Sequence, residues 1–230
     1  MKTNKSYSAI FTILIILLLS NIAYSIVPRP KDQARVYFSG QLPHNSIGGD
    51  FNGDLYLSVP ETGEIIMVPD NESALGFGGA IGYTKIGRNS LGYAVEIGFQ
   101  HSSHDYTYVG LTGKSSLNIL NFDIKGIFSY TPVEPYLLVG IGIPWLSIEN
   151  GSDFGTANPV DAKYSGVGIN LGAGLDLFLI PNLSFGGRVV YRYISYSQVK
   201  GSGEKIKIED GVGGSGVQIC GNLTFHVPIE

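Results

Sequence analysis

The sequence predicts an all-β protein, an eight-stranded antiparallel up-and-down transmembrane β-barrel, with ten strands as the alternative. Three observations support this prediction. Apolar residues recur at every second position, charged residues keep to one of the two resulting faces, and short connections alternate with long ones. Charged residues make up 15% of the chain, whereas soluble domains carry roughly 25%. The chain has no basic excess, so we do not expect a nucleic-acid partner.

The N-terminus has the layout of a secretory signal peptide. Lys2 and Lys5 precede an apolar run over residues 9–23, and Ala23-Tyr24-Ser25 places small residues at the −3 and −1 positions of a cleavage site. An uncleaved anchor is the alternative, but a spanning helix needs about 20 apolar residues. We expect residues 1–25 to be removed by cleavage near Ser25 and residues 26–230 to form one barrel domain. Cys220 is the only cysteine, which excludes an intrachain disulfide.

Residues 166–178 show the period of two most clearly. One parity is apolar throughout, and the other is mostly glycine. Residues 91–99, 120–130 and 183–193 alternate in the same way. A charge that faces lipid at mid-depth costs about 2–4 kcal/mol, whereas a charge in the lumen need not. In these four segments the apolar parity carries no charge, and the other parity carries Glu96, Asp123, Lys125, Asp176, Arg188 and Arg192.

The connections give the strand number and the orientation. Short turns at residues 85–90, 131–134 and 180–182 alternate with long connections near 42–73, 102–114, 149–163 and 200–211. This layout places both termini on the periplasmic side. A hairpin over 54–59 and 64–68 would give ten strands, but both runs are shorter than the about 9–11 residues that cross a membrane. Interfacial girdles are expected from Tyr83, Tyr130, Tyr136, Trp145, Phe178 and Tyr193.

Several segments resemble the small outer-membrane β-barrel proteins, the OmpA transmembrane domain and OmpX group of the porin family. The resemblance is carried by NILNFDIKGIFSY, TPVEPYLLVGIGI and YSGVGINLGAGLDLFLIPNLSFGGRVVYRYISYS. VYFSGQLP and GFGGAIGYTKIG more faintly resemble rickettsial surface-antigen barrels. The resemblance implies location in the bacterial outer membrane. Members usually end on an aromatic residue, so Phe225, followed here by five further residues, is expected to be a displaced signal for the assembly machinery.

The six interior charges support two hypotheses. Three acids and three bases in a narrow lumen would form a structural salt-bridge network, because unpaired buried charge is costly. The second hypothesis is a gated ion path through the same network. Neither hypothesis requires a cofactor, and we expect none.

Catalytic and metal sites are not expected. His101 and His104 lie near Asp105, but two histidines do not make a zinc site. Some outer-membrane barrels are lipid A deacylases with a His-x-Ser pair at the end of a late strand. Here Ser195 occupies the comparable place, and Tyr193 stands where the histidine would be. His101-Ser102-Ser103 matches the His-x-Ser pattern, but it lies in the third strand and not in a late one. Without a base beside Ser195, we predict no enzymatic activity.

We therefore expect a monomeric surface protein with a structural or adhesion and host-interaction role. Its expected partners are outer-membrane lipid, the assembly machinery and a host or surface ligand bound by the outer loops. A narrow porin-like channel is the first alternative. A lipid A-modifying enzyme is the second.

Overall fold

A computed structural model describes residues 33–58, 63, 65–130, 132–153, 158–202 and 205–229. The predicted signal peptide and its cleavage position near Ser25 lie outside these residues. Among the described residues, no helix is long and apolar enough to cross a membrane.

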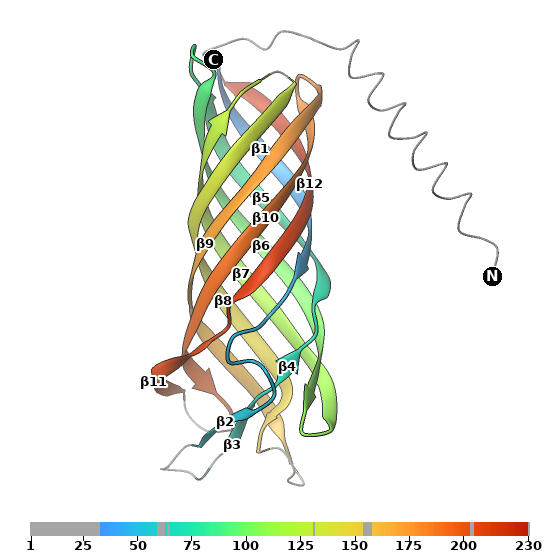
Figure 1. The fold of residues 1–230 in the computed structure, drawn as a ribbon, viewed down its shortest axis with the longest axis vertical. Helices are drawn as coiled ribbons and strands as arrows, with labels where there is room; N and C mark the ends of the chain where they lie inside the picture. The colour runs from blue at the N-terminus through green and yellow to red at the C-terminus, as the bar shows by residue number, and fades with distance from the viewer. Residues whose placement is uncertain are drawn as a thin grey trace, which may run out of the picture.

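Eight antiparallel strands form a closed ring (Figure 1). Each strand pairs with the next along the ring, and the last pairs with the first from Ala34 opposite Ile229 to Asn45 opposite Gln218. The prediction of eight strands is confirmed. In ring order the strands are β1 (Ala34–Asn45), β5 (Ala74–Ile86), β6 (Leu91–Tyr108), β7 (Leu111–Phe128), β8 (Val133–Ser152), β9 (Val160–Ile180), β10 (Leu183–Lys200) and β12 (Gly216–Ile229).

The two ends of the barrel differ. Short turns and the end of β12 lie at one end, called here the short-turn end (Figure 1). The other, the long-loop end, carries β2 (Leu55–Ser58), β3 (Ile65–Val68), β4 (Asp70–Asn71) and β11 (Ile206–Gly213). The alternative of ten strands is wrong. β2 and β3 pair with each other, and the only strand pairing of β3 with the ring in the described residues is Ile66 opposite Ser152. Four residues are too few to span a membrane.

The strands extend further toward the long-loop end than the sequence suggested. The loop expected over residues 102–114 is a continuation of β6 and β7, which pair from Leu91 opposite Phe128 to Tyr108 opposite Leu111. The hairpin turns at Val109 and Gly110, both at positive φ (46° and 80°). Tyr106 and Tyr108 keep the inward parity beyond the apolar belt, so the alternation that makes a strand persists there.

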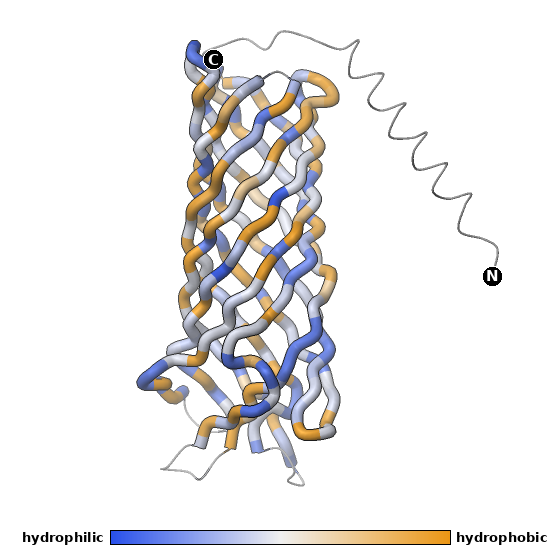
Figure 2. Tube along the Cα trace, in the orientation of Figure 1, coloured by the Kyte–Doolittle hydropathy of each residue, from blue (hydrophilic) through white to orange (hydrophobic). Residues whose placement is uncertain are grey.

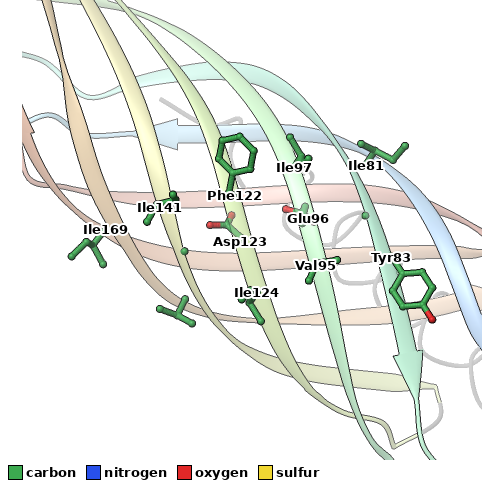
Figure 3. A pocket seen from close by; sticks show the side chains of 13 residues that line it. Ile81, Tyr83, Val95, Glu96, Ile97, Phe122, Asp123, Ile124, Ile141 and Ile169 are labelled. Atoms are coloured by element: carbon green, nitrogen blue, oxygen red, sulfur yellow. The ribbon is translucent and has the colours of Figure 1, made fainter.

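The outer wall of the barrel is an apolar belt. Hydrophobic and polar residues alternate along the strands (Figure 2). An apolar groove of about 780 Å³ crosses the wall over β5–β9, lined by outward residues such as Ile81, Ile97 and Phe122 (Figure 3). Glu96 and Asp123 lie on the same strands, but their side chains are buried. This wall has the character of a surface that contacts lipid chains.

Two residues of the predicted girdles are not on this wall. Tyr130, Trp145 and Tyr193 are exposed, whereas Tyr136 and Phe178 are buried in the lumen. Tyr136 has the opposite parity to the exposed Leu137, so its place next to a turn misled the prediction.

Candidate functional site

The centre of the lumen holds a buried ionic cluster around Glu96. Its carboxylate accepts hydrogen bonds from Lys125 Nζ at 2.5 Å, Arg188 Nη1 at 2.9 Å and Tyr37 OH at 2.9 Å. Lys125 also lies over the rings of Tyr37 and Tyr136. Three of the six predicted interior charges are thus brought together in two ion pairs. The paired acid and bases compensate one another where water is scarce.

The other three charges lie inside the barrel but bond to amide side chains. Asp123 accepts a hydrogen bond from Asn170 at 2.9 Å, and Asp176 accepts one from Asn222 at 3.1 Å. Arg192 has no ion pair among the described residues. It donates to the side-chain oxygens of Asn45, Gln100 and Gln218 at 3.2, 2.6 and 3.0 Å.

Asn45, Gln100 and Gln218, together with Gln41, form a second hydrogen-bonded layer, nearer the long-loop end. Gln218 Nε2 donates to Gln100 Oε1 at 2.7 Å, and Gln100 Nε2 donates to Gln41 Oε1 at 2.8 Å. Gln41 also accepts from Arg188 at 2.9 Å, which connects the amide layer to the ionic cluster. The lumen is therefore filled by bonded side chains at two successive levels.

An apolar plug closes the lumen beyond these polar layers. It is formed by Ile47, Phe51, Ile66, Met67 and Val68, which come from the segment between β1 and β5. Phe51 packs edge-on against Tyr164 and Tyr196 at centroid distances of 5.4 and 5.5 Å. Tyr164 donates a hydrogen bond to the Met67 carbonyl at 2.7 Å. The plug residues and the inward residues around them are almost wholly buried, so these side chains are shielded from solvent.

The His-Ser-Ser-His motif is divided between the two faces of β6. Ser102 and His104 point inward and are buried, whereas Ser103 is exposed on the outer wall and His101 is half-buried. Because the two histidines are an odd number of positions apart, they cannot share a metal ion. No cluster suited to a metal occurs among the described His, Cys, Asp and Glu residues.

The inward pair is fully bonded. His104 Nδ1 donates to the Glu72 carbonyl at 2.7 Å, and its Nε2 accepts from Ser102 at 2.8 Å. Asn45 in turn donates to Ser102 at 3.1 Å. His104 lies beyond the apolar belt, and its burial lowers its pKa below the ordinary value.

The outward pair has a different setting. His101 Nδ1 lies 2.9 Å from Asn118 Oδ1, and its Nε2 lies 3.4 Å from Ser103 Oγ.

Ser195, by contrast, is exposed on β10 and has no histidine partner among the described residues. Phe225 is half-exposed on the outer wall and lies between Phe38 of β1 and Leu183 of β10.

Several known outer-membrane proteins have a similar fold. OprG from Pseudomonas aeruginosa is 13% identical (TM-score 0.47, covering 88% of this chain and 98% of that chain). Ail, the attachment invasion locus protein of Yersinia pestis, is 14% identical (TM-score 0.46, 86% and 100%). Neisserial surface protein A is 14% identical (TM-score 0.45, 83% and 96%). No curated protein sequence matches the chain. A family model described as outer membrane protein beta-barrel domain matches residues 14–219.

Proposed function

Because the chain belongs to the family of outer membrane protein β-barrel domains, we propose that it is a monomeric surface protein whose role is structural or adhesive. The family match confirms the resemblance to small outer-membrane barrels, and the family implies the bacterial outer membrane as its location. In such barrels the short turns face the periplasm and the longer loops face outward. The long-loop end is then the face that meets the surroundings of the cell.

The closed lumen is the observation that supports this proposal best. Passage through the barrel would have to break the Glu96 ion pairs, separate the Arg192 amide layer and displace the apolar plug. An eight-stranded barrel is just wide enough for side chains to fill. A role at the long-loop face requires none of these changes.

The charge at this face suggests the chemistry of a partner. Described acidic residues beyond the apolar belt outnumber basic ones. The acids are Asp50, Asp54, Asp70, Glu72, Asp105, Glu149, Asp153, Asp161, Glu209 and Asp210, and the bases are Lys114, Lys163, Lys200, Lys205 and Lys207. Such a face repels polyanions and suits a partner with exposed basic groups.

A charge-neutralised variant tests the proposal on whole cells. Asp54→Asn, Glu209→Gln and Asp210→Asn together alter exposed loop carboxylates and leave the lumen unchanged. Surrogate bacteria that display this variant should adhere several-fold less to cultured host cells than bacteria that display the unchanged protein. Lys85→Gln at the short-turn end is the matched control. Equal adhesion by the neutralised variant and the unchanged protein would reject the adhesive role.

The channel alternative makes a separate prediction. If the ionic cluster is a gate, Arg188→Ala or Asp123→Ala should change the conductance of planar bilayers. Unchanged conductance in both variants would exclude that gate.

Assembly involves a further expected partner. We infer that Phe225 is read by the assembly machinery, because it continues the outward parity of β12 and is exposed. Phe225→Ala should therefore slow membrane assembly, as measured by the fraction of heat-modifiable protein after a pulse of synthesis, whereas Val227→Ala should not.

A further inference from the structure

A row of four outward residues crosses β5, β6, β7 and β8 at the long-loop edge of the apolar belt. Phe77 lies opposite His101, His101 opposite Asn118, and Asn118 opposite Trp145. Phe77 and Trp145 are exposed aromatics of the kind that form interfacial girdles. Two polar residues interrupt this girdle at the depth where lipid chains meet headgroups.

These polar residues align a serine hydroxyl. The Asn118 carbonyl oxygen accepts from His101 Nδ1 at 2.9 Å, so the proton of the neutral imidazole is on Nδ1 and Nε2 is left as an acceptor. Ser103 Oγ lies 3.4 Å from that nitrogen. The Phe77 ring, 5.2 Å from the imidazole centroid, packs beside the histidine. Nucleophile, base and orienting group are thus connected in the order used by hydrolytic triads.

We propose that Ser103, His101 and Asn118 form a hydrolytic site for the carboxylic acyl esters of membrane lipids. This inference departs from the expectation of no enzymatic activity, which depended on Ser195 and on a pair in a late strand. The sequence contained the motif, but only the pairing of β6 with β7 brings Asn118 to the histidine.

The reaction is an ordinary acyl transfer to water. Ser103 Oγ bonds to the ester carbonyl carbon while His101 Nε2 takes the hydroxyl proton. The ester C–O bond then breaks, and the proton passes from His101 to the departing alcohol. Water, deprotonated by the same nitrogen, cleaves the acyl-serine, releasing the fatty acid and restoring the hydroxyl. Ser116 lies directly opposite Ser103 on β7, and in the proposed site its hydroxyl is the donor assigned to the developing oxyanion.

The position of Ser103 indicates the class of substrate. Along β6, Phe99 and Val95 face the lipid on one side of the site, and Asp105 faces solvent on the other. An amphipathic ester could lay its acyl chain along the apolar belt and keep its polar part among the loops. Its carbonyl would then lie at the level of the serine. Glycerophospholipids and acylated saccharide lipids share this chemistry.

The inward pair of the same motif provides a contrast within the molecule. Ser102 and His104 are closer, at 2.8 Å, but both are buried, and the serine is held by Asn45. No lipid can reach them. Reactivity is therefore expected on the outer face alone.

Covalent labelling tests the nucleophile. The full mature protein, folded in lipid vesicles, is treated with an alkyl fluorophosphonate, and the modified serine is identified by mass spectrometry. Ser103 should be labelled, and His101→Gln should slow labelling about 100-fold or more, the typical contribution of a general base. Ser195→Ala is the control, as an exposed serine without a histidine. Labelling of Ser103 no faster than that of Ser195, in protein with a normal heat-modifiable shift, would overturn the proposal.

Acyl release tests the substrate and the positioning residue. Free fatty acid is measured from phosphatidylglycerol vesicles and, separately, from purified lipopolysaccharide, to distinguish the two lipid sources. Release should disappear in Ser103→Ala. Asn118→Ala should reduce it, and Asn118→Asp, which still accepts from Nδ1, should restore it; a merely structural role would not favour the carboxylate. Ser103-independent release, or none from either lipid, would overturn the proposal.

Discussion

A charge placed in the apolar plug should expel it from the lumen. Met67 is 1% exposed within the plug, whereas Tyr56, its direct partner across the β2–β3 hairpin, is 59% exposed. Met67→Asp removes the burial of a large apolar side chain, worth about 1.5–3 kcal/mol, and adds an unpaired polar group that costs about 1–3 kcal/mol more. A loss of about 4 kcal/mol lowers the ratio of closed to open plug by roughly three orders of magnitude.

Hydrogen exchange in lipid measures this opening directly. Backbone amides of Ile66 to Val68 should exchange faster in Met67→Asp, whereas Tyr56→Asp, which introduces the same carboxylate at the paired and exposed position, should leave them protected. The barrel strands should stay protected in both variants, because the ring is closed without the plug. Equal exchange of β3 in the two variants would refute the reasoning that burial holds this segment.

Alkylation of Cys220 tests whether the polar layers beyond the plug also close the lumen. Cys220 is buried in the lumen opposite Arg188, beyond the Arg192 amide layer as seen from the plug. If the two closures act in series, neither Met67→Asp nor Arg192→Ala alone should speed alkylation of Cys220 by a small water-soluble maleimide. The double variant should speed the alkylation of Cys220. Fast alkylation in Met67→Asp alone would show that the amide layer does not block the path.

Three further predictions concern the barrel and its long-loop end. Glu96→Gln leaves Lys125 and Arg188 without their shared carboxylate and should lower the free energy of unfolding by about 3–5 kcal/mol in a urea titration; Asp123→Asn, which keeps an oxygen for Asn170, should cost much less. Gly140→Ala would bring a Cβ against Asp123 and the Phe122 carbonyl, so it should lower the free energy of unfolding by about 1–3 kcal/mol. Gly126 has open space around it, so Gly126→Ala should be nearly neutral in the same titration. The pKa of His104 is lowered in the folded protein. The stability that neutral His104 contributes is therefore complete above the ordinary histidine pKa of about 6.5 and is lost as pH falls through the folded-state pKa. Amide exchange at Glu72 should accelerate over that pH range, and His104→Gln should abolish the pH dependence.

The alternation of residues along each strand was enough to predict much of the molecule. Parity alone placed Glu96 and Arg188 in the lumen, because their neighbours on the chain face lipid. It could not predict that Glu96 meets both Arg188 and Lys125. The first contact crosses the barrel from β6 to β10, and the second is diagonal between the neighbouring strands β6 and β7, so both depend on the stagger between strands. Nor could parity show that Asp123 and Arg192 bond to amides instead of to each other.

The plug was missed although the sequence contained its signal. Leu117, Ile119 and Tyr164 have the inward parity yet are apolar, so the lumen beyond the charges needed an apolar filling. The run Ile65 to Val68 could supply it, but a short hairpin in a long connection gives no indication of whether it folds outward or inward. Only the three-dimensional structure shows that this run folds inward, into the lumen.

The extended β6–β7 hairpin places its tip well above the membrane surface. From His101 to Tyr108 the strand rises about 23 Å at about 3.3 Å per residue, and a tilt of about 40° leaves roughly 18 Å along the membrane normal. A large rigid partner that touches the hairpin tip would therefore stand well clear of the headgroups and could not reach Ser103. Molecules that arrive from the surroundings and molecules that diffuse within the leaflet would meet this protein at different heights, and one encounter need not obstruct the other.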